Sequence, residues 1–324
     1  MSGFPDKSDL QILFAHVAYN FAEPFTARGS GLKFIEARSA AELDARIADA
    51  DVLVISGLWK NELAAKAPRL RFIQSIGAGT DQFSREVLRA HNIRLASASG
   101  VNANAVAEHA ISLVLALSRQ LHLLRDAQAA RHWRPMQGDR NVREDEIEGK
   151  TLLVVGLGRI GQRLAEFGKA FGMKVIATRR DPAAGKGAAD AVHADTELNA
   201  LIPSADFIVL TCPLTPQTEK LLGKAQIAAM KPTAFLVNVA RGKVVDEPAL
   251  IAALQAKRIA GAGIDVTVEE PLPSSSPLWA MPHVIVTPHS AGETRRYEDR
   301  VIDFLLENVD RLSRGESRLV NGIV

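Results

Sequence analysis

The sequence predicts an α/β protein with two Rossmann-like or flavodoxin-like domains, parallel sheets and a catalytic cleft between them. At 324 residues, the chain exceeds the size at which one hydrophobic core usually stops growing. Short apolar runs alternate with helical patterns, and such alternation produces right-handed crossovers and parallel sheets. A late amphipathic helix, with Tyr297, Val301 and Leu305 on one face and Gly315 after its end, needs a surface to cover. We expect it to return to the first domain.

The expected boundaries follow from these patterns. Residues 1–100 and 291–324 should form one discontinuous domain, and residues 101–290 should form the other. The first contains strand candidates at 12–15, 51–56, 70–76 and 93–96. One long helix is expected over 104–126, where apolar residues recur at helical spacing without Gly or Pro. Six strands are expected in the second domain, at 151–155, 174–178, 207–211, 235–239, 264–266 and 284–287.

Composition narrows the classes of function. Lys and Arg number 39 and Asp and Glu number 37, and neither sign forms a long block. This balance argues against nucleic acid or a membrane as partner, so we expect a small molecule. The single cysteine, Cys212, and the absence of an apolar stretch after a basic N-terminus favour a cytoplasmic protein. No metal site is expected.

A glycine motif predicts a dinucleotide site. Gly156, Gly158 and Gly161 form GxGxxG between an apolar strand and the helical stretch 162–171, with Arg159 and Ile160 inside the motif. The glycines permit a tight turn, close approach of a pyrophosphate and close packing of helix on strand. The helix N-terminus then offers amide donors to the anion. The alternative is a glycine-rich turn that binds no ligand.

The end of the next strand indicates which nicotinamide cofactor binds. Arg179 and Arg180 stand where NAD-binding folds usually carry an acid that holds the ribose. Guanidinium groups suit a 2′-phosphate, so NADP(H) is favoured and NAD(H) stays possible. In the alternative, both arginines are solvated and Asp181 contacts the ribose of NAD.

Three polar segments each follow a predicted strand. They contain Arg241, Glu270 and His289. Chemistry in open α/β sheets gathers at the carboxyl ends of the strands, so these side chains should converge. Each residue also has a structural alternative: an ion pair with Asp246 for Arg241, a solvated surface position for Glu270, with Glu269 as an equal candidate, and a cap for His289.

These motifs, taken in order, resemble the D-isomer-specific 2-hydroxyacid dehydrogenases, in particular glyoxylate and hydroxypyruvate reductases. The resemblance covers nearly the whole chain. It also includes the segments 75–79 (SIGAG), 100–108 (GVNANAVAE) and 213–218 (PLTPQT). It implies an oxidoreductase that transfers a hydride between NAD(P)H and a small 2-keto or D-2-hydroxy acid. It further implies a homodimer built on the cofactor domain, with the discontinuous domain binding substrate.

The resemblance also implies roles for the three polar residues. Arg241 would hold the substrate carboxylate and polarise the carbonyl, which suits its planar fork of donors. His289 would give its proton to the carbonyl oxygen as the hydride arrives, and take it back in oxidation. Glu270 would orient the imidazole and favour its protonated form, as an adjacent negative charge does.

Further positions are carried over from the family. Expected cofactor contacts beyond the glycine motif and the arginine pair are Pro213, Thr218, Val239, Ala240, Asp265, His289, Ala291 and Gly292. Expected substrate contacts are Gly77, Ala78, Gly79, Asn102 and Arg241. The amides of 77–79 can form an anion nest, although a plain strand-to-helix turn also explains these glycines. Leu58 and Trp59 indicate an apolar or mixed wall of the substrate pocket.

Two features leave the activity open. Many relatives carry Pro in place of Ser99 and Arg in place of Asn104, so the local hinge and its charge differ here. A dinucleotide-sensing scaffold, like the corepressors of this fold, is the alternative function, and turnover with a keto acid separates the two.

Overall fold

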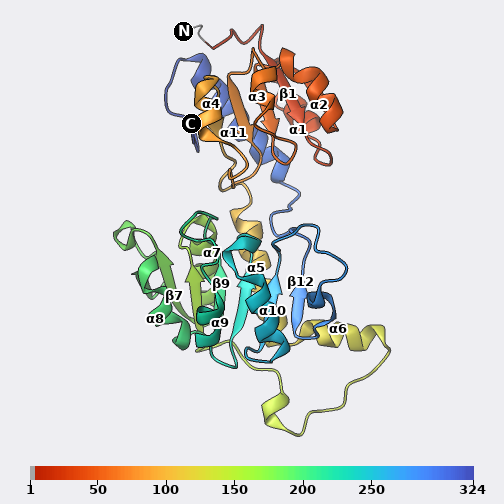
Figure 1. Cartoon of the computed structure of the whole chain (residues 1–324), viewed down its shortest axis with the longest axis vertical. Helices are drawn as coiled ribbons and strands as arrows, with labels where there is room; N and C mark the ends of the chain where they lie inside the picture. The colour runs from red at the N-terminus through yellow and green to blue at the C-terminus, as the bar shows by residue number, and fades with distance from the viewer. Residues whose placement is uncertain (1–3) are drawn as a thin grey trace. The chain divides into compact units, whose positions relative to one another are not determined.

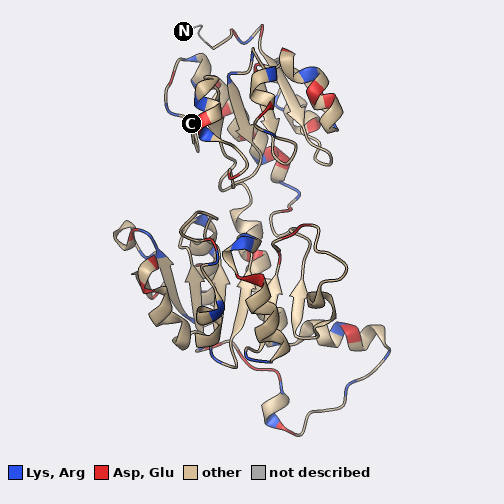
Figure 2. Ribbon diagram, in the orientation of Figure 1, with Lys and Arg blue, Asp and Glu red and all other residues tan. Residues whose placement is uncertain are grey.

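The computed structural model describes residues 4–324 and divides into two units (Figure 1). Unit 1 consists of the described residues up to Asn102 together with Thr294–Val324, and unit 2 is Ala103–Glu293. The chain therefore passes twice between the units. That they are independent domains stays a prediction from the sequence. Figure 2 shows Lys and Arg interspersed with Asp and Glu over both units.

Unit 1 is a parallel sheet of five strands in the order β2-β1-β3-β4-β5. Its strands are β1 (Gln11–Ala15), β2 (Lys33–Ala37), β3 (Val52–Ile55), β4 (Phe72–Ser75) and β5 (Arg94–Ala96). Its helices are α1 (Ala22–Ala27), α2 (Ala40–Arg46), α3 (Leu63–Lys66), α4 (Arg85–Ala90) and α11 (Tyr297–Ser313), with a 3₁₀ turn at Ile47–Asp49.

Alternating side chains of the unit 1 strands form a core on each face of the sheet. Ile12 and Phe14 pack with Val301 and Leu305 of α11, while Leu13 belongs to the cluster on the other face. Successive residues of a strand point to opposite faces, which explains this division. The return of the last helix to the first sheet is therefore confirmed.

Unit 2 is a parallel sheet of seven strands in the order β12-β11-β10-β9-β6-β7-β8. Its strands are β6 (Thr151–Val155), β7 (Lys174–Arg179), β8 (Ala191–Ala194), β9 (Phe207–Leu210), β10 (Phe235–Asn238), β11 (Gly261–Ile264) and β12 (Val284–Val286). Its α-helices are α5 (Ala103–Ser118), α6 (Leu121–Ala129), α7 (Arg159–Ala170), α8 (Leu198–Leu201), α9 (Lys224–Ala229) and α10 (Glu247–Gln255). Short 3₁₀ turns lie at Arg140–Val142, Pro182–Ala184, Asp195–Glu197, Ile202–Ser204, Gly242–Val244 and Pro277–Ala280.

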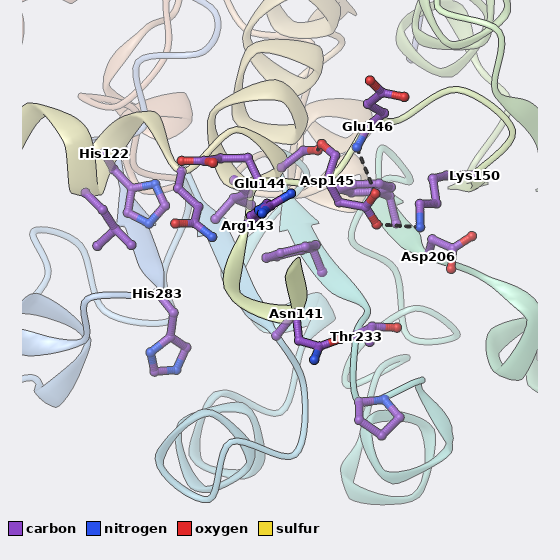
Figure 3. A pocket seen from close by; sticks show the side chains of 18 of the residues that line it. His122, Asn141, Arg143, Glu144, Asp145, Glu146, Lys150, Asp206, Thr233 and His283 are labelled. Atoms are coloured by element: carbon purple, nitrogen blue, oxygen red, sulfur yellow. Dashed lines mark hydrogen bonds and ion pairs between the residues drawn. The ribbon is translucent and has the colours of Figure 1, made fainter. Parts of the chain in front are cut away.

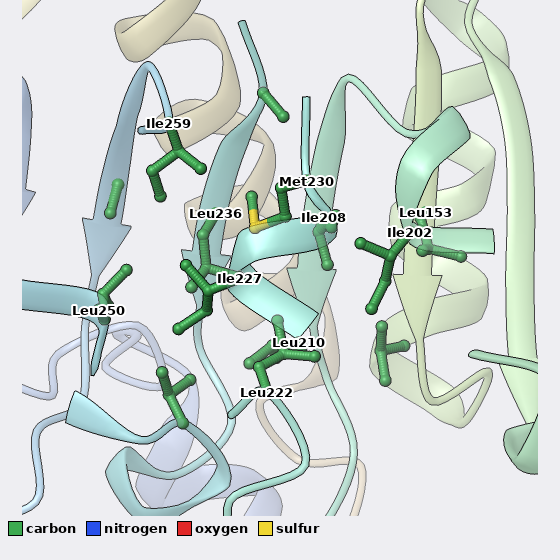
Figure 4. Close-up of a cluster of buried hydrophobic side chains, with 14 of the residues drawn as sticks. Leu153, Ile202, Ile208, Leu210, Leu222, Ile227, Met230, Leu236, Leu250 and Ile259 are labelled. Atoms are coloured by element: carbon green, nitrogen blue, oxygen red, sulfur yellow. The ribbon is translucent and has the colours of Figure 1, made fainter. Parts of the chain in front are cut away.

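The central strands of unit 2 are covered on both faces. On one face, Leu210 and Leu236 pack with Ile227 of α9 and Leu250 of α10 (Figure 4). A second cluster on the other face includes residues of α5 and α7. Strands buried on both faces have nearly continuous apolar sequences, which is why these strands were visible in the sequence. The α/β class with parallel sheets is confirmed.

Each sheet has one strand more than expected, and both additional strands, β2 and β8, lie at sheet edges. Every residue of β8 and most of β2 is partly exposed. An edge strand needs less apolar surface than a central strand, so KFIEA and AVHA lack the apolar run that marks the others. The expected counts of four and six strands were therefore wrong.

Two expected boundaries also change. The helix expected over 104–126 is two helices, because Gln120 adopts a left-handed conformation with φ of 51° between α5 and α6. None of the residues in α6 is buried, so packing does not keep it in line with α5. The strand expected at 264–266 is β11 at Gly261–Ile264. A side chain at Gly263 would come within 3.1 Å of Leu113, so the close packing of α5 requires small residues there.

Candidate active site

The glycine motif forms the turn between β6 and α7. Gly156 has a positive φ of 102°, and a Cβ there would lie 2.8 Å from the Cys212 backbone. A Cβ at Gly161 would lie 2.3 Å from the Gly156 oxygen, so these two glycines allow close packing of strand, turn and helix. At Gly158, by contrast, a Cβ would meet nothing within 4 Å. This open space beside the N-terminus of α7 fits the approach of a pyrophosphate.

Arg159 and Ile160, the first two residues of α7, follow this turn. The residues expected at the cofactor's adenosine end lie at the end of β7 and directly after it. Arg179 ends the strand, and its Nη1 donates to the Gly185 oxygen at 2.8 Å, while Arg180 is exposed. The carboxylate of Asp181 accepts from the Ala183 amide at 3.0 Å and caps a 3₁₀ turn. The arginine pair therefore stands at the carboxyl edge of the sheet.

The segment after β9 is shaped by Thr218, whose hydroxyl donates to the Pro213 oxygen at 2.6 Å. The Thr218 hydroxyl oxygen in turn accepts from the Thr215 amide at 2.8 Å. Cys212 begins this segment, and burial raises the pKa of its thiol to about 12. The thiol is therefore protonated at neutral pH and is a poor nucleophile.

Arg241 is positioned by a residue whose role sequence reasoning missed. Asn238, the last residue of β10, is 3 % exposed. Its Oδ1 accepts from the Ala240 amide at 3.0 Å, and its Nδ2 donates to the Arg241 oxygen at 3.0 Å. The side-chain oxygen and nitrogen of Asn238 thus close the turn that contains Val239 and Ala240, and both of these residues are largely buried. An asparagine near the end of a predicted strand often forms hydrogen bonds to the backbone of the following turn, and this pattern would have identified the role of Asn238.

His289 and Glu270 form a direct pair. His289 Nδ1 lies 2.8 Å from Glu270 Oε2, and Glu270 Oε1 accepts from the Thr267 amide at 3.1 Å. A carboxylate only accepts, so Nδ1 carries a proton and Nε2 is the nitrogen that can gain or lose one. The side chains are 47 % and 38 % exposed, so this pair adds little to folding stability and chiefly orients the imidazole.

Asp265 anchors the turn that carries His289. Its backbone oxygen accepts from the His289 amide at 2.8 Å, and its carboxylate accepts from the Ser290 and Ala291 amides at 3.0 and 3.1 Å. The aspartate is 2 % exposed. These bonds hold His289 in a left-handed conformation with φ of 53°. Gly292 follows this turn directly.

Backbone packing places the segment of Arg241 beside the loop that carries Glu270. A Cβ at Gly242 would lie 2.1 Å from the Thr267 carbonyl carbon, so residues 241–242 pack directly on the loop that leads to Glu270. The segments with Arg241, Glu270 and His289 therefore meet at the carboxyl ends of β10, β11 and β12. For Arg241, Nη1 donates to the Ala240 oxygen at 2.8 Å. Asp246 caps α10 by accepting from the Ala249 amide.

The expected substrate contacts other than Arg241 lie in unit 1. Gly77, Ala78 and Gly79 follow β4, where the Gly77 oxygen accepts from the Ala98 amide at 3.0 Å, and Asn102 ends this part of the chain. Trp59 is 4 % exposed, stacks on Phe83 and donates to Asn61. The expectation that Trp59 lines a pocket is therefore wrong, because its ring belongs to the core.

A cavity of about 580 Å³ lies at the opposite edge of the unit 2 sheet. Lys150, Asp206 and His283 border it at the amino ends of β6, β9 and β12 (Figure 3). Asp145 and Lys150 pair across part of its wall at 2.6 Å. This cavity is thus separate from the histidine, glutamate and arginine segments. Among residues 4–324, no group of three acidic, histidine or cysteine side chains is arranged to hold a metal ion, and no helix has the length and apolarity to span a bilayer.

The chain is similar to a known family and to several known proteins. A family model described as the NAD binding domain of D-isomer specific 2-hydroxyacid dehydrogenases matches residues 111–291. Glyoxylate/hydroxypyruvate reductase B of Klebsiella pneumoniae is 39 % identical over 262 residues, covering 77 % of this chain and 79 % of the relative. D-3-phosphoglycerate dehydrogenase of Methanocaldococcus jannaschii is 37 % identical over 280 residues, which are 85 % of this chain and 52 % of the relative. The chain thus spans about half the length of this second relative.

Solved structures have the same fold. The NADPH-dependent glyoxylate/hydroxypyruvate reductase of Sinorhizobium meliloti, solved in complex with NADP and malonate, is similar with a TM-score of 0.82 and 26 % identity. The similarity covers 98 % of this chain and 97 % of that structure. By the family match and by these relatives, the chain belongs to the D-isomer specific 2-hydroxyacid dehydrogenases.

Proposed function

We propose that this protein reduces a small 2-keto acid, with glyoxylate or hydroxypyruvate favoured, to the corresponding 2-hydroxy acid, using NADPH. The observation that carries the proposal is the pair of His289 and Glu270 at 2.8 Å, on a loop against which residues 241–242 pack. Two relatives named as glyoxylate/hydroxypyruvate reductases support the choice of substrate.

The proposed mechanism assigns one task to each side chain. Arg241 binds the substrate carboxylate through its planar fork of donors. His289, oriented through Nδ1 by Glu270, donates the proton on Nε2 to the carbonyl oxygen and so becomes neutral. The dinucleotide, when bound, supplies the hydride that the carbonyl carbon gains. The products are the 2-hydroxy acid and the oxidised cofactor, and solvent returns the proton to His289.

Residues of unit 2 that we assign to the cofactor follow the carboxyl edge of the sheet. The glycine turn and the N-terminus of α7, with Arg159 and Ile160, would hold the pyrophosphate. Pro213, Thr218, Val239 and Ala240 follow β9 and β10, and Asp265, Ala291 and Gly292 lie at the turn of His289. Asp265 Oδ2 accepts only the Ala291 amide among the hydrogen bonds described above, which leaves it capacity for a carboxamide N–H. The substrate contacts of unit 1 stay predictions from the sequence.

A panel of keto acids with both cofactors tests this function. We expect oxidation of NADPH with glyoxylate or hydroxypyruvate, and kcat/KM with NADPH about tenfold or more above that with NADH, because Arg179 and Arg180 suit a 2′-phosphate. Arg179→Ala should reduce this preference about tenfold, which is the size of one hydrogen bond to a charged group. Arg163→Ala, on α7 and paired with Glu166, is the matched control and should preserve it.

Two outcomes would contradict the proposal in different ways. A higher kcat/KM with NADH would overturn the assignment of the arginines and favour contact of Asp181 with the ribose. Binding of NADPH without turnover of glyoxylate, hydroxypyruvate, pyruvate or phenylpyruvate would overturn the reductase itself.

We also propose that the protein is a homodimer in which a second copy covers the segment 121–142 of unit 2. This segment exposes Trp133 and Met136 by 94 % and 99 %, and Leu121 and Val142 by more than half. Several large apolar side chains exposed along one segment are typical of an interaction site. Four arginines between 131 and 143 precede four acids between 144 and 148. Glu144 and Asp145 pair within the chain with Arg134 and Lys150, so charge pairing between two copies related by a two-fold axis would involve the other members of these two groups.

Light scattering tests the dimer. We expect the mass of two chains at micromolar concentration, and a shift to one chain for Trp133→Ser/Met136→Ser, because the apolar anchors are lost. Val17→Ser, which changes a residue of unit 1 that is 64 % exposed, should leave the mass unchanged. A single-chain mass for the unsubstituted protein would refute the proposal.

A further inference from the structure

His109 on α5 is a largely buried histidine to which the proposed reaction assigns no task. Its side chain is 24 % exposed. Its Nε2 lies 3.0 Å from Thr287 Oγ1 and 3.7 Å from Asp265 Oδ1. Thr287 directly follows β12, two residues before His289, and Asp265 directly follows β11. A histidine 178 residues away from Thr287 in sequence thus reaches the base of the proposed catalytic turn.

The proton positions in this chain of contacts follow from the groups present. Thr287 Oγ1 lies 2.6 Å from Asp265 Oδ1. An ionised carboxylate has no proton to give, so the single hydroxyl proton of Thr287 points to Asp265. Thr287 Oγ1 must then accept from His109, which places a proton on His109 Nε2. The bonds therefore run in one direction, from His109 through Thr287 to Asp265.

Asp265 connects these hydrogen bonds to the turn that carries His289. Its carboxylate accepts from Thr287, Ser290 and Ala291, and its backbone oxygen accepts from the His289 amide. At 2 % exposure, the carboxylate cannot replace a lost partner with bulk water at low cost. The orientation of its oxygens consequently depends on the protein donors around it.

We propose that His109 is a positioning residue that, through Thr287, orients Asp265 and the turn carrying His289. The inference rests on the proposed reductase function and adds a residue to it. Without a donor at position 109, Thr287 Oγ1 no longer accepts the bond from His109, and the side chain that donates to Asp265 Oδ1 is held less firmly in place. Small displacements of a proton donor lower the rate of transfer more than they lower substrate binding.

The test is a double-mutant cycle in steady-state kinetics on the full chain. We expect His109→Leu to lower kcat about tenfold, the equivalent of one hydrogen bond, with KM for the keto acid changed by less than about threefold. His109→Gln should restore most of the loss, because the glutamine amide nitrogen occupies nearly the place of Nε2 and donates in the same way. Ser112→Ala, at an exposed position of α5, is the control and should resemble the unsubstituted protein.

The second arm of the cycle tests whether the effect of His109 on kcat depends on the Thr287 hydroxyl. If His109 acts through this hydroxyl, His109→Leu in a Thr287→Val background should change kcat by less than about twofold, because interacting residues are not additive. Thermal unfolding and NADPH titration of each variant separate loss of folding or of cofactor from loss of positioning.

Each outcome decides the inference. Absence of turnover in the unsubstituted protein overturns the reductase and this inference with it. Turnover in that protein with unchanged kcat for His109→Leu, or with equal losses for His109→Leu and His109→Gln, overturns the inference alone. Independent, additive losses for His109→Leu and Thr287→Val show that the effect does not pass through Thr287, and also contradict it.

Discussion

Replacing His289 with glutamine should lower kcat by about a hundredfold or more, with NADPH affinity nearly unchanged. Glutamine retains a hydrogen-bonding side chain beside Glu270 but cannot release and regain a proton as an imidazole can, so general acid catalysis is lost. The backbone bond from residue 289 to the Asp265 oxygen does not involve the side chain and should persist. Steady-state kinetics with glyoxylate and fluorescence titration with NADPH measure the two quantities.

A second histidine of the same unit provides the control. His283 stands at the opposite edge of the sheet, where its Nε2 lies 3.1 Å from the Leu254 oxygen. His283→Gln should therefore keep kcat within about twofold of the unsubstituted protein. Turnover close to normal in His289→Gln would show that another group transfers the proton.

Replacing Gly242 with alanine should abolish most activity and also destabilise the fold. The added Cβ would lie 2.1 Å from the carbonyl carbon and oxygen of Thr267 and 2.5 Å from the Val268 nitrogen. These are backbone atoms that cannot rotate away, so the segments of Arg241 and Glu270 must separate. Overpacking of this kind costs about 1–3 kcal/mol of stability, and the displaced arginine should lower kcat/KM about a hundredfold.

Gly158→Ala is the matched comparison, because the same methyl group at that position meets nothing within 4 Å. It should leave the thermal midpoint unchanged and weaken NADPH binding, since the methyl occupies the space assigned to the pyrophosphate. Thermal unfolding and kcat/KM distinguish the two variants. A Gly242→Ala protein with unchanged midpoint and activity would contradict the packing of the two loops.

The sequence was sufficient where one local pattern decides the structure. Continuous apolar runs identified the central strands of both sheets, and GxGxxG identified the turn before α7. It was insufficient at the sheet edges, at the break at Gln120 and at Trp59. An edge strand can be partly polar, a helix can end without Gly or Pro where its continuation has no fully buried residue, and a tryptophan in a loop can turn into the core.

For the candidate site, too, the sequence was sufficient for some features and insufficient for others. The sequence by itself determined which chemical groups are present, namely a guanidinium, a carboxylate and an imidazole each placed after a strand, together with the glycine turn. Only the tertiary structure decided their partners: Glu270 with His289, Asn238 with the Arg241 turn, and His109 with Thr287 and Asp265. The physical reason is that strand order, rather than separation along the chain, brings these segments to one edge of the sheet, and donor and acceptor geometry then selects which of them bond.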